Sequence, residues 1–240
     1  MYYYNIKMDA EKDNINKANE KIKEEQEEQQ KEQDVNTSIF GWVFFIIIAL
    51  NVYLQYSKLT KPYIIRILTY FLLICIQSAM SSTVLRTRCG NIENMTAYIF
   101  MTFIPWIVIF LPVEMFLLNK FPAWKTPFSN TFGYLTTKLL GVRKVLTSIL
   151  DKTNTSDEIL KNIYKDPSLF INEITEDNFD NMVKIMFPML QKDEDLEKLL
   201  RFIKIKDYVA VFVWYWLISN LIVHMNKHYL SGIPCNIQPI

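Results

Sequence analysis

The chain has 240 residues, of which half are apolar and 14% are aromatic, and its formal net charge is only +1. Such a balance of charge indicates neither a nucleic-acid partner nor an acidic one. Three cysteines are too few for a disulfide scaffold. The charged residues crowd between four apolar windows, a segregation that is typical of a polytopic membrane protein.

Residues 1–38 form a polar segment that is rich in Glu, Gln and Lys. Its apolar stripe is limited to Ile15, Ala18 and Ile22, which is too little for several coiled-coil heptads. We expect a solvated helix or a disordered tail, and a partner-binding arm is the alternative. The N-terminus lacks the pattern of a removable signal peptide, so the first span is expected to drive insertion.

Residues 39–118 hold three predicted membrane spans, Ile39–Tyr56, Tyr63–Leu85 and Met95–Leu118. The first is close to the roughly 20 residues that a bilayer requires. Pro105 and Pro112 lie inside the third span, where neighbouring helices can satisfy the freed carbonyls, and each is expected to bend it.

A fourth span is predicted over residues 208–228, followed by a tail over 229–240. Its apolar run, Tyr208–Val223, is short, so flanking residues must complete the crossing. The sequence therefore predicts an all-α fold, a four-helix transmembrane bundle with a small helical extramembrane domain between spans three and four.

That domain occupies residues 119–207 and begins with an aromatic exit loop. In Gly133–Leu150 the apolar residues recur every three or four positions, which predicts an amphipathic helix with a basic face. Such a helix either lies along an anionic membrane surface or packs its apolar stripe onto the domain. Further helices are expected near 157–165, after a turn within 166–188, and over Glu194–Ile203.

The distribution of Lys and Arg predicts the orientation. Beside the first link and the long loop stand Lys58, Lys61, Arg66, Lys120, Lys125, Arg201, Lys204 and Lys206, against Lys31, Arg86, Arg88 and Lys227 on the other side. The positive-inside rule then places the long loop in the cytosol and both termini on the opposite side.

The exit loop carries the most specific pattern of the chain, PAWKTPFSNTFGY over Pro122–Tyr134, followed by DPSL at Asp166–Leu169 and INEI at Ile171–Ile174. These blocks, within residues 95–220, resemble a membrane protein shared among nucleocytoplasmic large DNA viruses of the mimivirus and phycodnavirus kind. The motif that we expect to fix the domain at the membrane exit comprises Trp124, Pro127, Phe128, Ser129, Asn130, Gly133 and Tyr134.

The resemblance implies a multi-pass protein of the virion inner membrane, or of a host membrane derived from the endoplasmic reticulum. It also implies a minor capsid component, whose partners are the capsid or other virion membrane proteins. It supplies no assigned active site.

Two polar residues stand out within the predicted spans. An acid inside a membrane span, here Glu114, is by default a functional candidate. Arg66 lies at similar depth on the same side, so we favour a structural ion pair that bridges spans two and three. His224 and His228 are four residues apart, which we interpret as interfacial histidines rather than a metal site.

No phosphate-binding loop, nucleophile elbow or paired-carboxylate arrangement is evident. We therefore predict no catalytic residue, cofactor or metal site, and no enzyme. The first functional hypothesis is a structural protein whose spans anchor the helical domain. The alternative is a small channel or transporter that uses the kinked third span and Glu114, although transporters usually contain internal repeats.

Four spans place Cys89 and Cys235 on the same side of the membrane. On the predicted orientation that side is oxidising during synthesis, so they form either a disulfide or two surface thiols. Cys75 lies within the second span and is expected to be a buried, reduced thiol.

Overall fold

The computed structural model describes residues 21, 23–24, 39–57, 62–89, 95–153, 163, 165–187 and 193–232, and every regular element among them is a helix. This confirms the all-α prediction. Apart from three residues, the polar N-terminal tail lies outside the described part, as do most of the predicted helix near 157–165 and most of the C-terminal tail. The chain divides into two units, Met1–Val43 and Phe44–Ile240, and the second holds the elements of interest.

Three helices are long and apolar enough to cross a membrane. They are Ile39–Ser57, Ile64–Arg86 within α2 (Pro62–Cys89), and the apolar part of α11 (Glu194–Gly232). They contain the first, second and fourth predicted spans. The third predicted span begins with a shorter apolar helix, Met95–Phe110, and its helix type changes along its length.

Prolines mark these changes. The third segment runs through α3 (Met95–Pro105), the π-helical η1 (Trp106–Phe110) and η2 (Val113–Leu117), and α4 (Leu118–Lys120). Each π-helix directly follows a proline, Pro105 or Pro112, which has no N–H to donate to the preceding turn. Where the sequence predicted bends, the structure therefore has π-helical turns.

The π-helical turns keep one face of this segment buried. Every fourth residue from position 98 to 118 is buried, namely Tyr98, Thr102, Trp106, Phe110, Glu114 and Leu118. In a pure α-helix a spacing of four overshoots one turn by about 40°, so the six residues would drift around the helix. A π-helix bonds i to i+5 and has more residues per turn, which offsets the drift.

The apolar helices expose many apolar side chains on the outside and bury several polar side chains between them. Phe71, Leu68 and Ile46 are more than 60% exposed, whereas Gln77, Ser81 and Asn226 are fully buried. Soluble proteins rarely expose apolar surface on this scale, while helices in lipid hold their polar groups between them. This inversion of the usual pattern agrees with membrane-spanning helices.

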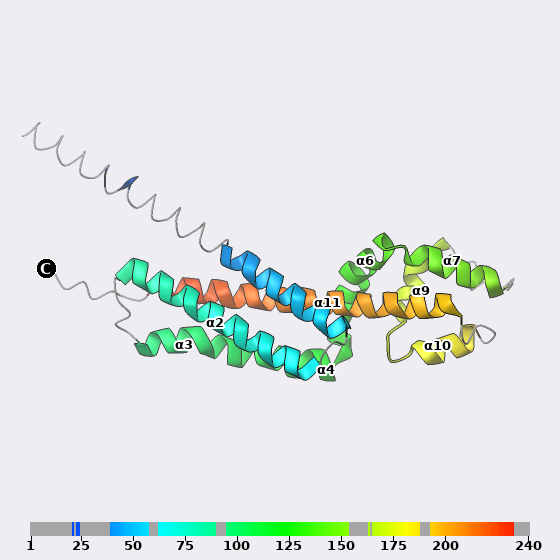
Figure 1. The fold of residues 1–240 in the computed structure, drawn as a ribbon, viewed down its shortest axis with the longest axis horizontal. Coiled ribbons are helices and arrows are strands. Elements are labelled where there is room, and N and C mark those ends of the chain that lie inside the picture. Colours follow the sequence, from blue (N-terminus) through cyan, green and yellow to red (C-terminus); the bar gives the residue numbers. More distant parts are fainter. Residues whose placement is uncertain are drawn as a thin grey trace, which may run out of the picture. The chain divides into compact units, whose positions relative to one another are not determined.

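The helical domain packs on the first half of α11. Figure 1 shows α11 passing beside α2 and α3 and continuing beside α6 (Tyr134–Leu139) and α7 (Val142–Thr153). The domain also contains α9 (Pro167–Glu173) and α10 (Phe179–Met186). Its core consists of Val142, Leu146, Ile149, Leu150, Ile163, Phe170, Ile171, Ile174, Phe179, Val183, Phe187, Leu196, Leu199 and Ile203.

The prediction of a single amphipathic helix over Gly133–Leu150 was wrong, because the structure has two helices there, α6 and α7. Gly141 adopts a φ of 97°, a left-handed conformation that favours glycine and ends α6. The apolar stripe is divided at this point. Leu139 is 80% exposed on α6, whereas Leu146 and Ile149 of α7 lie in the domain core. The stripe of α7 thus packs onto the domain rather than along a membrane surface.

Two further boundaries differ from the prediction. Asp166 caps α9 by accepting from the Ser168 N–H at 3.0 Å, so a helix stands where a turn was expected. The helix predicted over Glu194–Ile203 does not end before the last span. It is the first part of α11, which runs without interruption for 39 residues.

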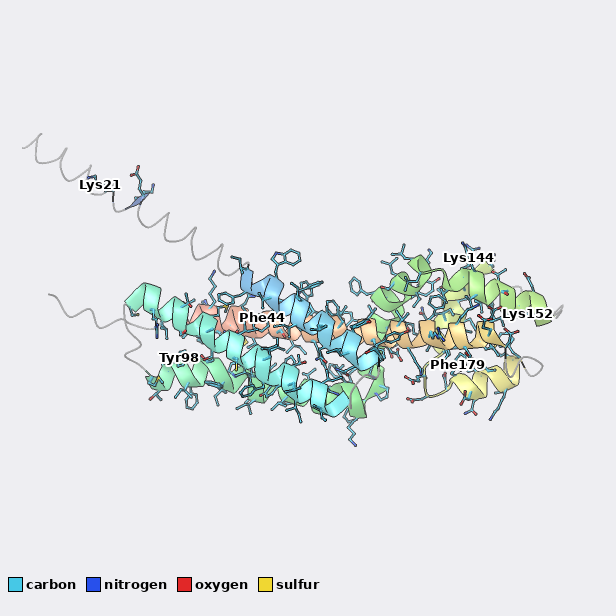
Figure 2. All side chains as sticks on the ribbon, viewed as in Figure 1. Lys21, Phe44, Tyr98, Lys144, Lys152 and Phe179 are labelled. Carbon is cyan, nitrogen blue, oxygen red and sulfur yellow. The ribbon has the colours of Figure 1, made fainter. Side chains whose placement is uncertain are left out.

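A charge cluster joins α7 to the start of α11. Lys152, at the end of α7 (Figure 2), lies 2.7 Å from a carboxylate oxygen of Asp193 and 2.8 Å from one of Asp195. Ser148 donates to Asp195 at 2.7 Å. Hydrogen bonds from Lys152 and Ser148 lower the pKa of Asp195 to about 2, and those from Lys152 and the Asp195 N–H lower the pKa of Asp193.

Acidification should therefore weaken the contact between α7 and α11. A carboxylate with a lowered pKa stabilises the fold above its ordinary pKa of 3.8, and this contribution is lost as the pH falls through the folded pKa, about 2 for Asp195. We expect Asp193→Asn with Asp195→Asn to lower the thermal midpoint at pH 7 and to have little effect near pH 2. Circular dichroism melts of the full chain in detergent measure this difference, and a constant difference across the pH range would contradict it.

Candidate functional site

A polar cavity of about 240 Å³ lies where the helical domain meets the apolar helices. It is lined from the first apolar helix (Ile39–Ser57), from α2, from α4 and the exit segment, from α9 and the turn after it, and from α11. The polar and charged lining residues are Gln55, Arg66, Lys125, Thr126, Ser129, Asn130, Asn172, Thr175, Glu176, Asp177, Lys206, Asp207, Tyr208 and Tyr215. We call this meeting point of the helical domain and the apolar helices the junction. It contains several ionisable groups, whereas the core of the domain is apolar.

The exit segment with the PFSNTFGY block is helical, and it is fastened to α11. It folds as the 3₁₀-helix η3 (Pro122–Trp124), α5 (Thr126–Phe128) and the π-helix η4 (Ser129–Gly133) instead of the predicted loop. Ser129 donates to the carboxylate of Asp207 at 2.8 Å. The block thus docks onto α11 at Asp207, immediately before its final apolar run.

Gly133 allows η4 to approach the backbone of α11 closely. A Cβ atom at this position would lie 2.4 Å from the carbonyl oxygen of Lys206 and 2.9 Å from its Cγ. Its own backbone is ordinary right-handed helix, with φ of −62°. The glycine is therefore required by space and not by backbone conformation.

Lys206 is buried within the same contact, with 1% of its surface exposed. Its Nζ donates to the carbonyls of Ile171 at 2.7 Å and Ile174 at 3.0 Å, and reaches Asn130 Oδ1 at 3.5 Å. The two carbonyls lie at the C-terminal end of α9, where a cation also interacts favourably with the negative end of the helix dipole. Burial lowers the pKa of the Lys206 ammonium, while Asp207 and Glu173 oppose this shift.

Aromatic residues complete the attachment on the membrane side. The Trp214 indole N–H donates to the Trp124 carbonyl at 2.8 Å, and the two rings lie 5.8 Å apart. Phe128 packs edge-on against Trp214 at 5.0 Å. The expected anchoring motif therefore has contacts to α11 through Trp124, Phe128, Ser129, Asn130 and Gly133. Tyr134 packs against the domain core, and Pro127 accepts a hydrogen bond from Thr131.

Glu114 lies in the interior of the apolar helices, 5% exposed. Tyr215 donates to its carboxylate at 3.3 Å, and the Arg66 guanidinium is near enough to interact with it electrostatically. The structure thus brings Arg66 and Glu114 to one polar cluster. Direct pairing of their charged groups stays a prediction.

An aromatic layer borders this cluster. Tyr70 and Trp106 lie 5.9 and 5.0 Å from Phe110, and Tyr215 lies 5.6 Å from the same ring. Phe44 stacks on Trp106 at 6.0 Å. These rings fill the interior one turn away from Glu114 along the third segment.

Beyond this layer several of the buried side chains are again polar. Among the described residues, Gln77 Oε1, Thr102 Oγ1, Ser219 Oγ and both amide atoms of Asn226 are buried without a hydrogen-bond partner in the protein. Because these atoms include both donors and acceptors, ordered water fits them better than a cation, which needs acceptors alone.

The cysteines differ in state. Cys89 is disulfide-bonded, whereas Cys75 is a free thiol. Cys75 is exposed on the outside of α2, so the expectation that it is buried was wrong; its position on the helix faces away from the neighbouring helices. Cys235 lies outside the described residues, and its pairing with Cys89 stays a prediction.

No group of three or more His, Cys, Asp or Glu side chains gathers in a metal-binding arrangement within the described part of the chain. His224 Nδ1 lies 2.8 Å from the Asn220 carbonyl, and His228 packs edge-on against Tyr229. Both contacts are local to α11.

Several residues of the junction were not singled out by their sequence pattern. Lys206 reads as one of several interfacial lysines, and Asp207 has no pattern of its own. Trp214 and Tyr215 read as ordinary members of an aromatic-rich span. The roles of Asp207, Trp214 and Tyr215 depend on Ser129, Trp124 and Glu114, which lie 78, 90 and 101 positions earlier in the chain. Lys206 depends on the carbonyls of Ile171 and Ile174, 35 and 32 positions earlier.

Comparisons with protein families, with curated proteins and with solved structures found no match to this chain.

Replacing Gly133 by Ala should loosen the contact between η4 and α11. The new methyl group would meet the Lys206 backbone, and overpacking of this kind costs about 1–3 kcal/mol. We expect a lower thermal midpoint and faster proteolysis of the helical domain. Gly232→Ala is the matched control, because a Cβ atom there meets nothing within 4 Å. Equal behaviour of the two variants would contradict the steric argument.

The disulfide of Cys89 is expected to join Cys235. Leu85 near the end of α2 and Leu230 near the end of α11 belong to one packed cluster, so the chain leaves α11 close to Cys89. A non-reducing peptide map of protein alkylated before lysis should contain the linked pair and an alkylated Cys75. Alkylation of both Cys89 and Cys235 would refute this pairing.

Proposed function

We propose that the chain is a structural membrane protein of a large DNA virus, which anchors the helical domain of residues 119–207 at the virion inner membrane. The domain faces the cytosolic side and links the membrane to the capsid or to other virion membrane proteins. The proposal combines the resemblance of the PFSNTFGY block with the observation that this block attaches the domain to α11.

The continuity of α11 is the observation that supports a mechanical role. One unbroken helix of 39 residues supplies part of the domain core and also the last apolar run. A domain built on such a helix has no flexible linker on that side. It is further held by Ser129, Lys206 and Trp214, so a force applied to the domain passes directly into the membrane helices.

The surface of α6 and α7 offers contact groups for a partner. Leu139 and Leu140 are 80% and 57% exposed beside Lys138. Lys144 points away from α11 on the outer side of α7 (Figure 2). Exposed apolar residues rimmed by charge are common at protein interfaces.

The alternative function is a small channel or transporter. The buried Glu114 and the polar atoms of Gln77, Thr102 and Ser219 favour it, because ion pathways use such groups. The packed rings of Tyr70, Trp106 and Phe110 favour the structural role, since they occupy the interior between these two polar regions.

Cross-linking within purified particles, set against conductance in reconstituted vesicles, tests the two functions. We expect cross-links from Lys138 and Lys144 to a capsid protein, and no conductance above that of empty vesicles. A conductance that Glu114→Gln abolishes, without cross-links to the capsid, would replace the structural role by the channel.

Variants at the attachment test the anchoring step. Trp124→Ala with Phe128→Ala removes two ring contacts to Trp214, each worth about 0.5–1.5 kcal/mol beyond its buried area. We expect weaker incorporation into particles and lower protease resistance of the domain. Phe121→Ala, at a 56% exposed ring of the same exit segment, is the control. An unchanged double variant would show that these rings do not anchor the domain.

A further inference from the structure

The helical domain has an open groove of about 1130 Å³ along α7, and none of its lining residues belongs to the junction cavity. We call it the α7 groove. It is lined from the end of α6, from the turn at Gly141, from α7 and from Phe202 of α11. On α7 the lining extends from Arg143 to Lys152, which is roughly 13 Å at 1.5 Å per residue. A partner segment of about two helical turns matches this length.

Apolar residues line the α7 groove at its base and at one end. Val145 of α7 and Phe202 of α11 are partly buried and pack against the domain core. Leu139 and Leu140, where α6 ends, are more than half exposed. Exposed apolar residues bordered by charge mark interaction sites, so the groove offers apolar surface for a partner to bury.

The charged residues that line the α7 groove are Lys138, Arg143, Lys144, Asp151 and Lys152. Two of the cations have acidic neighbours within the domain. Lys152 is paired with Asp193 and Asp195. Lys138 is near enough to Asp166 to interact with it electrostatically. Neither of these two lysines is therefore counted as a charge that awaits a partner.

The remaining cations, Arg143 and Lys144, stand together at the start of α7. Both are exposed, and neither forms an ion pair with any other residue that the structure describes. The acid of the groove, Asp151, lies seven residues beyond Lys144, about two helical turns further along α7. The start of the groove is therefore positive and lies beside the exposed leucines.

The α7 groove leads away from the apolar helices. Lys152, at its far end, is bonded to Asp195, which precedes Tyr208 by roughly 20 Å along α11. Figure 2 shows Lys144 and Lys152 in the helical domain, remote from Phe44 in the first apolar helix. A flat bilayer around the apolar helices does not follow the groove along α7, so its position favours a protein over a lipid surface.

We propose that the α7 groove binds an acidic amphipathic segment of a partner protein, about two helical turns long. The apolar side of this segment packs on the exposed leucines and on Phe202, and its carboxylates approach Arg143 and Lys144. This is the mode in which an amphipathic helix lies in a groove. The inference rests on the proposed function, because it names the chemistry by which the domain holds a capsid or virion membrane protein.

The test ligand is a fluorescein-labelled synthetic peptide of Glu and Leu, with the leucines at helical spacing. It is titrated onto the full-length protein in phosphatidylcholine nanodiscs, and empty nanodiscs give the background. The comparison peptides are a Lys and Leu peptide of the same pattern and a shuffled Glu and Leu peptide. Fluorescence anisotropy should show saturable binding of the patterned acidic peptide, about tenfold tighter than that of either comparison peptide. Equal binding of all three would overturn the proposal.

Reversal of the two free charges tests their role. Arg143→Glu with Lys144→Glu should weaken binding of the acidic peptide about tenfold and should strengthen binding of the basic one, since repulsion replaces attraction. A variant that merely misfolds gains no binding. Lys165→Glu with Lys184→Glu, at two exposed lysines outside the groove, is the matched control. Equal losses in the two double variants would contradict a site at the groove.

Leu139→Ser tests the apolar contact. It should weaken binding of the acidic peptide about tenfold, because a leucine that the peptide covers is lost. Ile185→Ser on α10 is the control, since Ile185 is 77% exposed, close to the 80% of Leu139, and lies outside the groove. The same loss in both variants would show that the peptide does not bind at the groove.

Vesicles of phosphatidylglycerol test a lipid surface as the occupant. Vesicles that bind wild type, fail to bind the charge-reversed variant and displace the acidic peptide would overturn the proposal in favour of a membrane.

Cross-linking from Lys144 within particles separates this inference from the proposed function. The cross-linked partner segment should contain an excess of Asp and Glu. A capsid segment without that excess, or a second copy of this chain, would overturn the groove's ligand, and the capsid segment would leave the anchoring role in place. Peptide binding as expected, without a cross-link to any virion protein, would support the groove and contradict the proposed function alone.

Discussion

The close contact between η4 and α11 is the constraint on which the rest of the structure depends. Gly133 has no side chain, so the π-helix can lie directly against the backbone of α11 at Lys206. This approach buries the lysine, whose ammonium then requires acceptors that water no longer supplies. The carbonyls at the end of α9 provide them. The absence of a side chain at Gly133 therefore allows three elements, η4, α9 and α11, to pack in a single arrangement.

The same junction determines how the domain and the apolar helices are connected. Because α11 is one continuous helix, the residues that it contributes to the domain core lie at a set distance from the start of its apolar run. The exit segment returns to α11 through Ser129 and through the Trp124 carbonyl, so the helical domain is attached at two points. Two attachments restrict rotation about the helix axis, which one helix alone would allow. This arrangement suits transmission of force better than it suits a hinged, moving domain.

The two prolines of the third apolar segment influence which of its residues are buried between the helices. Pro105 and Pro112 interrupt the α-helical bonding, and the π-helical turns that follow hold a four-residue repeat on the inner face. That repeat places Glu114 beside Tyr215 and Trp106 within the aromatic layer. The cost of burying a carboxyl group is offset by a hydrogen bond and by the nearby guanidinium of Arg66. An ordinary α-helix with the same sequence would turn some of these residues toward the outside.

The sequence by itself determined the helical class, three of the four predicted spans as helices able to cross a membrane, and the position of the attachment motif, since these depend on composition and on neighbours along the chain. The predicted third span is instead a shorter apolar helix, Met95–Phe110, that is continued by further helical turns. It did not determine which lysine is buried, because Lys204 and Lys206 have nearly the same local surroundings and differ in what packs on them. It also gave one helix for Gly133–Leu150, whereas Gly141 ends the first helix with a positive φ. Leu139 and Leu146 belong to the same sequence repeat, yet one is exposed and the other is in the core. Tertiary structure decided these cases because burial, unlike helix propensity, depends on residues that are distant in the chain.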